Sequence, residues 1–435
     1  MAKIIKHIHI LGIAGVMTAP LAIALKDQGY IVTGSDQKNI YPPVSDLISD
    51  IPINTTPIDN HIDLAIIGSS FLSFSRCLNE FNQIKKLNIP YISATIYLSQ
   101  KLIKPNSILI AGSFGKTTIS ALVAWILNKN NFHPSYFFGG QLTNNSPSIK
   151  FNSSDWSTVE ADESINGLDT KAKFLYYPVK YLILTSIDWE HKDSYSTAKD
   201  NFEAYRQLVK NIPSDGVLVY NQSDPEIPKL LPECKGKILP YSSTKKFDSH
   251  LIGEYNQQNI AAGYTLCQYL GIKNEDITKS ITTFPGIKKR LEKVYSTKNI
   301  HIFNDFAQSA IRVKSALKAL KYSFPDHHLK VYFDPRATFL QNRSSLLGFS
   351  EILPLIDDFV LGKISFSADI PSSDRVTAKD WQNIFGTKFH YLPTNENIID
   401  YYSANLRPGD LLVNFSSGGL DGLNNLKKVY NHIKL

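Results

Sequence analysis

The stretch AGSFGKTTIS at residues 111–120 constrains the fold more than any other part of this chain. The apolar run SILIAG (107–112) predicts a buried strand that leads into it. The run TTISALVAWILNK (117–129) predicts a following helix, with a buried face formed by Ile119, Leu122, Val123, Ile126 and Leu127. Glycines at a strand-to-helix turn let the backbone approach an anion, which the free N–H groups of the helix attract. We therefore expect this loop to bind the phosphates of a nucleotide.

The residue types in the loop suit phosphate binding. Lys116 is placed to reach the outer phosphates, and the Thr117 hydroxyl is placed to ligate Mg²⁺. The loop is shorter than the standard pattern because Ile110 stands where a first glycine is usual. The alternative is a turn with chance glycines, but strand, loop, Lys-Thr and helix occur in the order that phosphate binding requires. The predicted nucleotide contacts in this loop are Gly112, Ser113, Gly115, Lys116, Thr117 and Thr118.

Two acidic clusters follow later predicted strands. They are VEADES (159–164) and TSIDWEHKDSY (185–195). Ligands of open α/β sheets collect at the carboxyl ends of the strands, and carboxylates beside a phosphate loop are suitable Mg²⁺ ligands. Either cluster alone could be a solvated acidic loop, but the two together behind a phosphate loop favour a metal site.

A second glycine turn lies near the N-terminus. The strand HIHIL (7–11) precedes Gly12 and Gly15, and a second strand ends at Ser35 and Asp36. An acid about 20 residues beyond a glycine turn is typical of dinucleotide folds, where it binds a ribose hydroxyl. One glycine of that fingerprint is missing, and a dehydrogenase would leave the second nucleotide site unexplained.

The 435 residues exceed one ordinary core, and short apolar runs alternate with helical periodicities almost throughout. This pattern predicts an α/β protein with parallel sheets. The predicted strands are 7–11, 63–68, 107–112, 180–186, 330–334 and 410–415. Turn-rich stretches near KLIKPNS (101–107) and FPGIKKR (284–290) predict domains over residues 1–104, 105–285 and 286–435.

Composition restricts the partners and the compartment. The net charge of +7 is spread along the chain, so we expect no nucleic-acid partner. The three cysteines lie far apart, which excludes a disulfide framework and favours a reducing compartment. The apolar N-terminus imitates a signal peptide, but His7 and His9 interrupt its start, and Lys26 and Asp27 follow it directly. We expect a cytoplasmic monomer without membrane insertion.

The order of these features resembles the Mur ligase family of peptidoglycan biosynthesis over essentially the whole chain. GEYNQQNIAA (253–262) is similar to the segment that holds adenine in the family, with Asn256 and Asn259 kept. FPGIKKRLE (284–292) resembles the family's domain hinge, with Arg290 facing the nucleotide phosphates. NDFAQSA (304–310) resembles a motif whose aspartate, here Asp305, contacts the ATP ribose.

The resemblance implies three α/β domains: a Rossmann-like domain for a UDP-sugar, a central P-loop-type ATPase domain and a Rossmann-like C-terminal domain. It implies ATP-dependent amide formation through an acyl phosphate, with Mg²⁺ as cofactor. The implied substrates are UDP-N-acetylmuramate and an amino-acid or peptide acceptor. The implied catalytic residues are Lys116, His191 and Arg290; Thr117, Glu160 and His191 would bind metal, and Gly12, Gly15, Ser35 and Asp36 the UDP-sugar.

Within the family, three segments resemble the peptide-adding branch that recycles cell-wall peptides. They are NIYPPVSDLI (39–48), FDPRAT (333–338) and LLVNFSSGGLDGL (411–423). Arg336 is the predicted contact to the peptide acceptor, because its guanidinium suits a carboxylate. The alanine-adding branch is the alternative. A weakened homologue is a third, because Gln308, Ser309 and Ala310 stand where the family has His-His-Pro.

Overall fold

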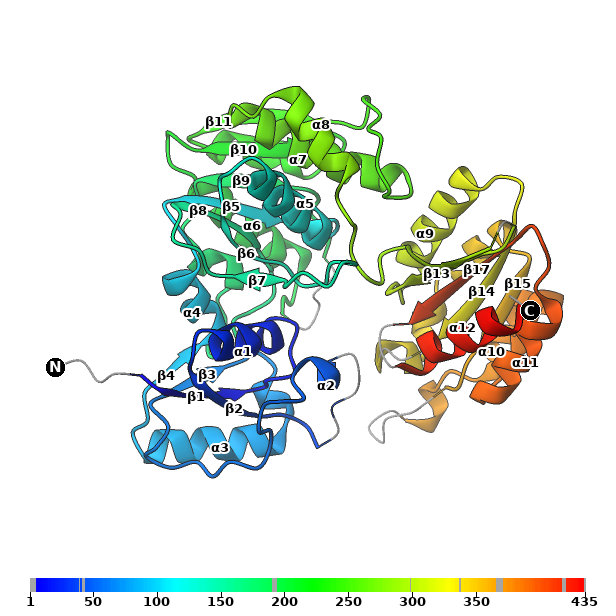
Figure 1. The fold of residues 1–435 in the computed structure, drawn as a ribbon, viewed down its shortest axis with the longest axis horizontal. Helices are drawn as coiled ribbons and strands as arrows, with labels where there is room; N and C mark the ends of the chain where they lie inside the picture. Colours follow the sequence, from blue (N-terminus) through cyan, green and yellow to red (C-terminus); the bar gives the residue numbers. More distant parts are fainter. Residues whose placement is uncertain are drawn as a thin grey trace. The chain divides into compact units, whose positions relative to one another are not determined.

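The computed structural model describes residues 5–38, 40, 44–189, 194–297, 299–335, 338–364, 371–416 and 420–433. It contains three sheets flanked by helices, as Figure 1 shows. The first two sheets lie in one compact unit, which extends to Pro285 and excludes residues 251–255. The third sheet lies in a second unit, which holds residues 251–255 and the chain from Gly286 onward.

The N-terminal sheet is parallel, with strand order β2-β1-β3-β4. A tight turn joins β1 to α1, so the predicted glycine turn lies at the carboxyl end of a central strand. The strands are β1 (His7–Leu11), β2 (Ile31–Ser35), β3 (Leu64–Ile67) and β4 (Tyr91–Ser93). The helices are α1 (Thr18–Asp27), α2 (Val44–Leu47), α3 (Ser75–Lys86) and α4 (Ala94–Lys101).

The central sheet has strand order β11-β10-β9-β5-β8-β6-β7 and is parallel except for the β6–β7 pair. Its strands are β5 (Asn106–Ala111), β6 (Ser135–Phe137), β7 (Ile149–Lys150), β8 (Trp156–Glu160), β9 (Tyr181–Leu184), β10 (Val217–Asn221) and β11 (Lys237–Tyr241). Its helices are α5 (Lys116–Lys129), α6 (Ala198–Lys210), α7 (Glu254–Tyr269) and α8 (Asn274–Thr282).

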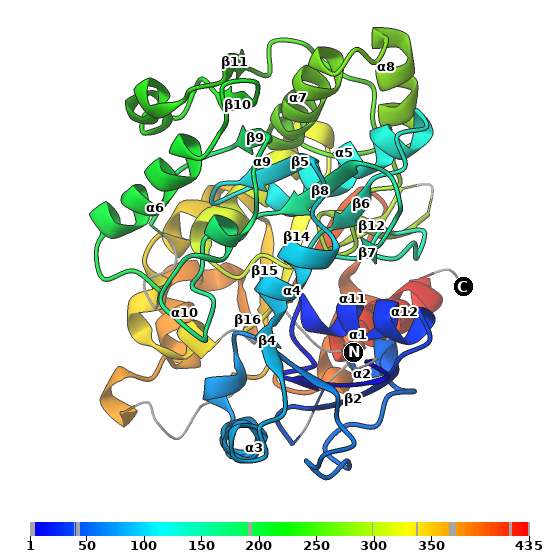
Figure 2. The same cartoon turned by 90° about the vertical axis from the view of Figure 1, so that its left-hand side faces the viewer.

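The phosphate loop lies where the winding of the central sheet reverses. The chain moves from β5 toward β6 in one direction and from β9 toward β10 in the other. Right-handed crossovers therefore place α5 and α6 on opposite faces of the sheet, as Figure 2 shows. The loop after β5 opens at this switch point, where ligands of open α/β sheets bind. The predicted apolar face of α5 is confirmed, because all five of its side chains are buried.

One apolar core continues from the N-terminal sheet into the central sheet. Leu98 and Leu102, at the end of α4, belong to the same buried cluster as Phe174 and Tyr177 of the central part. The Ser99 hydroxyl also donates a hydrogen bond of 2.6 Å to the Tyr176 carbonyl. The first unit therefore holds both glycine loops in a fixed relation.

The second unit is built on a six-stranded sheet with order β12-β13-β17-β14-β15-β16, parallel except for β12. Its strands are β12 (Glu292–Ser296), β13 (His301–Asp305), β14 (His328–Asp334), β15 (Asp358–Leu361), β16 (Phe389–Tyr391) and β17 (Asp410–Ser416). Its helices are α9 (Ala310–Ser323), α10 (Ala378–Phe385), α11 (Asn395–Asn405) and α12 (Leu420–Ile433). The prediction of an α/β protein with parallel sheets is confirmed.

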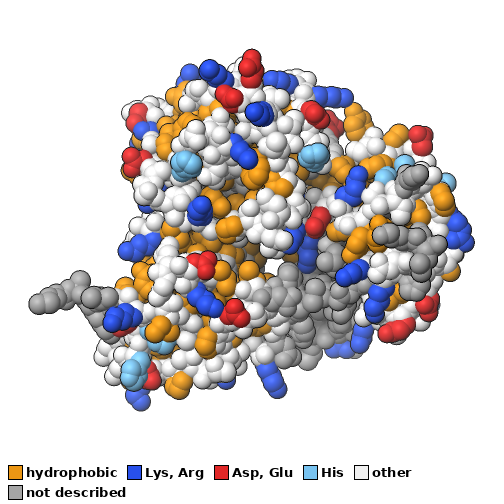
Figure 3. Space-filling view, viewed as in Figure 1, with side chains coloured by type: hydrophobic (Ala, Val, Ile, Leu, Met, Phe, Trp, Pro, Cys, Tyr) orange, Lys and Arg blue, Asp and Glu red, His pale blue; other side chains and the backbone are white. Residues whose placement is uncertain are grey.

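Short 3₁₀ helices complete the described chain: η1 (Phe71–Ser73), η2 (Lys173–Tyr176), η3 (Ile227–Glu233), η4 (Thr338–Gln341), η5 (Arg343–Leu346), η6 (Phe349–Leu355), η7 (Ser372–Asp374) and η8 (Gly386–Lys388). Among the described residues, no helix is both long and apolar enough to cross a membrane. Basic and acidic side chains are interspersed on the face drawn in Figure 3.

Candidate functional site

The backbone of the phosphate loop requires its glycines. Gly112 and Gly115 have φ angles of +122° and +81°, which residues with a Cβ rarely adopt. A Cβ at Gly112 would lie 2.2 Å from Thr185 Oγ1, and a Cβ at Gly115 would lie 2.4 Å from Asn259 Oδ1. Gly115 is also the residue before α5, so the loop ends at a helix N-terminus that attracts anions.

Hydrogen bonds join the phosphate loop to the end of β9. Ser113 Oγ donates to the Asp188 carbonyl at 3.1 Å and accepts from the Asp188 amide at 2.8 Å. The Phe114 amide donates to Ser186 Oγ at 3.3 Å. The predicted second acidic cluster therefore begins directly beside the loop. Its residues 190–193, which include His191, lie outside the described part of the chain.

Lys116 is buried and paired. Its ammonium donates to the Gly112 carbonyl at 2.7 Å and to the two Glu163 carboxylate oxygens at 3.1 and 2.8 Å. Burial disfavours the ammonium, but the nearby carboxylates of Glu163, Asp162 and Glu160 outweigh it and raise the pKa of Lys116. Lys116 is therefore a charged donor at the mouth of the loop.

Thr117 and Glu160 bring two oxygen ligands together. Thr117 Oγ1 lies 3.1 Å from Glu160 Oε1, and Glu160 Oε2 accepts from the Gly139 amide at 2.5 Å. Burial raises the pKa of Glu160, so a cation placed beside it would stabilise the ionised carboxylate. Hydroxyl and carboxylate oxygens are hard ligands, so this pair fits Mg²⁺. Among the described residues, no group of three His, Cys, Asp or Glu side chains could hold a metal by itself.

A second buried pair supports the same acidic segment. Lys173 Nζ donates to Asp162 Oδ2 at 2.8 Å and to Ser164 Oγ at 2.7 Å. Burial would raise the pKa of Asp162, but Lys173 and Lys116 lower it well below the usual carboxyl range. Lys173 was not anticipated, because it follows the acidic cluster by several residues and belongs to no motif. The Asp162 carboxylate is therefore paired with Lys173 within the acidic segment, whereas Glu160 is directed toward Thr117.

Two asparagines from the first turns of α7 reach the phosphate loop. Asn259 lies against Gly115, and its Nδ2 donates to Asn256 Oδ1 at 3.0 Å. Residues three apart on a helix share a face, so both amides point toward the loop side of α7. The segment that resembles an adenine-binding motif therefore lies beside the phosphate loop.

The N-terminal glycine turn is closed by the end of β2. The Gly12 and Ile13 amides both donate to the Ser35 carbonyl, at 2.8 and 3.1 Å. Asp36 Oδ2 accepts from the Ala14 amide at 2.8 Å, and Asp36 Oδ1 accepts from the amide of the next residue. Burial raises the pKa of Asp36 despite these bonds. The Asp36 carboxylate thus closes the turn in this structure, and its contact to a ribose stays a prediction.

The glycine turn and the phosphate loop face the same region of the first unit. A Cβ at Gly139 would lie 3.0 Å from Val16 Cγ1 and 3.1 Å from Glu160 Oε2. Val16 belongs to the glycine turn and is 67% exposed. A Cβ at Gly167, in the loop that follows Glu160, would lie 2.8 Å from the Ser69 backbone at the end of β3. A ligand on the glycine turn could therefore reach the Thr117–Glu160 pair.

In the second unit, Asp305 holds the hinge-like segment rather than standing free. Asp305 Oδ2 accepts from the Leu291 amide at 2.7 Å, and Oδ1 accepts from the Ala307 amide at 2.8 Å. Burial raises the pKa of Asp305. The Arg290 guanidinium lies 5.6 Å from the centre of the Phe306 ring. Asp305 therefore positions the backbone next to Arg290, and its contact to the ATP ribose stays a prediction.

The three C-terminal motifs meet at the carboxyl ends of three neighbouring strands of the third sheet. Asp305 pairs with Phe415, and Asp334 pairs with Ser416, across the parallel strands β13, β17 and β14. The Ser416 hydroxyl donates to Asp334 Oδ2 at 2.8 Å, and Gln308 Nε2 donates to the Phe415 carbonyl at 3.2 Å. Arg336 and residues 417–419 lie outside the described residues.

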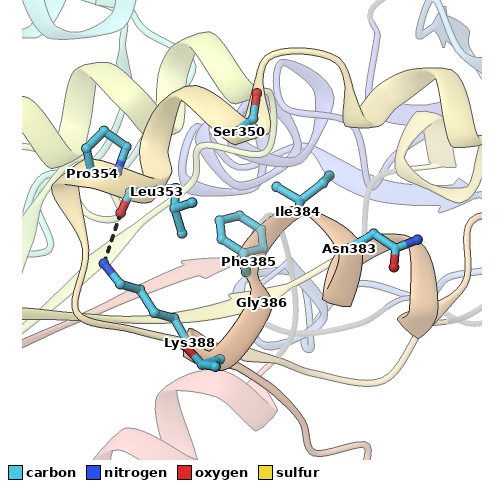
Figure 4. A pocket seen from close by; sticks show the side chains of 9 residues that line it. Ser350, Leu353, Pro354, Asn383, Ile384, Phe385, Gly386 and Lys388 are labelled. Carbon is cyan, nitrogen blue, oxygen red and sulfur yellow. Dashed lines mark hydrogen bonds between the residues drawn. The ribbon is translucent and has the colours of Figure 1, made fainter.

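A surface groove of about 500 Å³ in the second unit lies apart from these motifs (Figure 4). Leu353 and Pro354 of η6, Ile384 and Phe385 of α10, and Lys388 line it. The Lys388 ammonium donates to the Leu353 and Ile356 carbonyls, so it caps the end of η6. The groove offers no reactive group that the chemistry of the phosphate loop needs.

The switch-point loop, its buried lysine and the Thr117–Glu160 pair are typical of enzymes that use a nucleoside triphosphate. Residues 110–248 match the Mur ligase middle domain. The chain therefore contains a Mur ligase middle domain and is an ATP-dependent ligase.

Relatives of two kinds match the chain. The UDP-N-acetylmuramate–L-alanine ligase of Desulfitobacterium hafniense is 24% identical over 449 residues, which cover 95% of this chain and 97% of the relative. The UDP-N-acetylmuramate–L-alanyl-gamma-D-glutamyl-meso-2,6-diaminoheptandioate ligase of Haemophilus influenzae is 26% identical over 349 residues, which cover 73% and 76%. The relatives are named as ligases that act on UDP-N-acetylmuramate, and they differ in the acceptor.

Solved structures match the whole architecture. A murein peptide ligase from Psychrobacter arcticus has a TM-score of 0.69 at 21% identity and covers 98% of this chain and 99% of its own. A UDP-N-acetylmuramate–alanine ligase from Thermotoga maritima has a TM-score of 0.76 at 18% identity with the same coverage. The predicted three-domain α/β fold is therefore confirmed.

Proposed function

We propose that this chain joins the lactyl carboxylate of UDP-N-acetylmuramate to the amine of L-alanyl-γ-D-glutamyl-meso-diaminopimelate, with Mg²⁺ as cofactor. The observation that carries the proposal is the placement of two glycine loops in one unit. Val16 of the N-terminal turn and Glu160 of the central site both border Gly139. A sugar nucleotide bound at the turn by Gly12, Gly15, Ser35 and Asp36 can extend its carboxylate toward the phosphate loop.

The reaction requires activation of a poor acylating agent. A carboxylate oxygen attacks the γ-phosphorus of ATP, the bond to the β-phosphate oxygen breaks, and ADP leaves. The acceptor amine then attacks the carbonyl carbon of the acyl phosphate, inorganic phosphate leaves, and the amine loses a proton. Lys116 and Arg290 neutralise charge on the transferred phosphoryl group. Thr117 and Glu160 would hold one Mg²⁺, which would supply further charge neutralisation, and His191 is the proposed ligand of a second.

ATP binding uses the loop and α7. Gly112, Ser113 and Gly115 contact the phosphates together with Thr118 in the first turn of α5, where the helix N-terminus attracts an anion. Asn256 and Asn259 contact the adenine side. Asn259 lies against Gly115 and donates to the buried Asn256, which supports this assignment. Asp305 is the proposed contact to the ribose.

The peptide acceptor is proposed from the C-terminal motifs. FDPRAT and LLVNFSSGG end on the paired strands β14 and β17, and Ser416 bonds to Asp334 there. This pairing supports a single acceptor site that includes Arg336, whose guanidinium suits an acceptor carboxylate.

L-alanine is the second candidate acceptor, because the alanine ligase of D. hafniense aligns with 95% of this chain whereas the peptide ligase of H. influenzae aligns with 73%. Phosphate release from Mg²⁺-ATP and UDP-N-acetylmuramate should be measured with the tripeptide, with L-alanine and without acceptor. Release stimulated mainly by the tripeptide, with the ligated product identified by mass, supports the proposal. Release stimulated mainly by L-alanine would mean that L-alanine, and not the tripeptide, is the acceptor. Release with neither acceptor above background refutes ligation and favours a weakened homologue.

A further inference from the structure

A row of polar side chains, buried except at His7, runs beneath the N-terminal glycine turn, between two parallel strands and α3. His7 Nε2 lies 2.9 Å from Thr33 Oγ1, which lies 2.8 Å from His9 Nδ1. His9 Nε2 continues the row, 3.4 Å from Ser35 Oγ and 3.6 Å from Glu80 Oε2. The row therefore ends at the hydroxyl of the residue whose carbonyl closes the glycine turn.

Burying the polar side chains of His9 and Glu80 costs free energy, so we infer that the pair has a role other than stabilising the fold. His9 is 1% exposed and Glu80 is 8% exposed. Burial opposes ionisation of Glu80, but the polar groups of His9 and Ser35 and the charge of Arg76 outweigh it and lower the pKa of Glu80. A buried carboxylate that stays charged is expensive, and apolar residues of similar volume are often at least as stable. Among the described ion pairs, Arg76 is the arginine or lysine that faces this carboxylate, at 3.4 Å from Glu80 Oε1.

The same face of α3 also holds the residue after Ser35. Arg76 donates to the Asn54 carbonyl at 2.8 Å, and Asn54 Oδ1 accepts from the Asp36 amide at 3.0 Å. Glu80 lies one helical turn beyond Arg76, and His9 Nε2 lies close to both Glu80 and Ser35. Both ends of the Ser35–Asp36 segment are thus fixed from α3.

We propose that the His9–Glu80 pair is a positioning element that holds Ser35, and with it the Ser35 carbonyl that closes the glycine turn, in place for binding of the UDP-sugar. This inference rests on the proposed function, because it assumes that the glycine turn binds a sugar nucleotide. His9 and Glu80 act through Ser35 and touch no ligand. The pair therefore controls affinity for the sugar nucleotide without affecting the phosphate loop.

The test measures binding of UDP-N-acetylmuramate and of ATP separately by isothermal titration calorimetry. The variants of the full chain are Glu80→Gln, His9→Gln, Ser35→Ala and Glu80→Gln/Ser35→Ala. Glu80→Gln keeps the volume of the side chain and removes only its charge. Ser135→Ala is the matched control. Ser135 lies on β6, away from the glycine turn, and like Ser35 it is fully buried. Its hydroxyl hydrogen-bonds to the backbone of Asn152.

The expected result is a selective loss. Glu80→Gln and His9→Gln weaken binding of the UDP-sugar by about fivefold to tenfold, the size of one lost ordinary hydrogen bond, and change ATP binding less than twofold. In the Ser35→Ala background, Glu80→Gln adds less than a further twofold, because coupled residues are not additive. Ser135→Ala changes neither affinity.

Three results would overturn the inference. The first is wild-type affinity for the UDP-sugar in Glu80→Gln. The second is an equal loss of both ligands, which indicates a general loss of structure. The third is full additivity with Ser35→Ala, which means that the pair does not act through that hydroxyl. Failure of the wild-type chain to bind the UDP-sugar, with ATP binding intact, would instead refute the proposed function and with it the basis of the inference.

Discussion

Lys116 has two separable roles, and one pair of variants distinguishes them. Its ammonium is proposed to neutralise the transferred phosphoryl group, and in the structure it also neutralises Glu163. Replacing Lys116 by methionine removes both roles. Adding Glu163→Gln removes the buried carboxylate that the first substitution leaves without its cation.

The magnitude follows from burial. The side chains of Lys116 and Glu163 are 12% and 2% exposed and lie 2.8 Å apart. Removing one partner of such a buried pair costs about 3 to 5 kcal/mol. For a unit of this size, that corresponds to a fall in melting temperature of about 6 to 15 °C. The double variant removes both charges, so it should recover most of the loss and retain a deficit of about 1 kcal/mol.

Thermal unfolding and single-turnover ADP formation should be measured on the same samples. We expect Lys116→Met to lose both stability and activity, and the double variant to recover stability while its rate stays about 100-fold or more below wild type. The reasoning is wrong if Lys116→Met melts with the wild-type protein. It is also wrong if the double variant regains activity together with stability.

Three further predictions concern the loop and the metal pair. Gly115→Ala should weaken ATP binding about tenfold or more, because its Cβ would lie 2.4 Å from Asn259 Oδ1; Gly29→Ala, where φ is +90° with no atom within 4 Å, isolates the backbone cost of about 1 kcal/mol. The Mg²⁺ concentration for half-maximal rate should rise as the pH falls through the raised pKa of Glu160, because protonation removes the carboxylate ligand. Glu160→Gln should lack this pH dependence. If the variant has the same pH dependence as the wild-type protein, Glu160 does not bind the metal. Thr117→Val should raise the Mg²⁺ requirement about tenfold at constant stability, measured by Mg²⁺ titration of the rate, and wild-type behaviour would exclude the hydroxyl as a ligand.

Local periodicity was sufficient to predict the elements that carry the loops. The strand predicted at 107–112 occurs as β5 at Asn106–Ala111, and the strand at 7–11 is β1. The strand predicted at 330–334 begins earlier, at His328, because His328 and Leu329 also pair with β17. Burial of the α5 face follows from helical spacing, which depends only on neighbouring residues.

Contacts between distant segments could not be predicted in this way. Glu163 is 47 residues from Lys116, and the two meet only because β5 and β8 pair in parallel. Single-sequence patterns contain no register for that pairing, so Glu163 was assigned to a general acidic cluster. Asn259 was placed near the nucleotide through family resemblance, but its contact with Gly115 depends on how α7 packs against α5.

The account's central claim is that ATP activates the carboxylate of the sugar nucleotide. The most direct test uses UDP-N-acetylmuramate with ¹⁸O in both lactyl carboxylate oxygens, together with Mg²⁺-ATP and the tripeptide. The account predicts that the released inorganic phosphate carries one ¹⁸O atom, because the oxygen that attacks phosphorus leaves with it. Phosphate released during product formation without ¹⁸O would contradict the acyl phosphate and the proposed function.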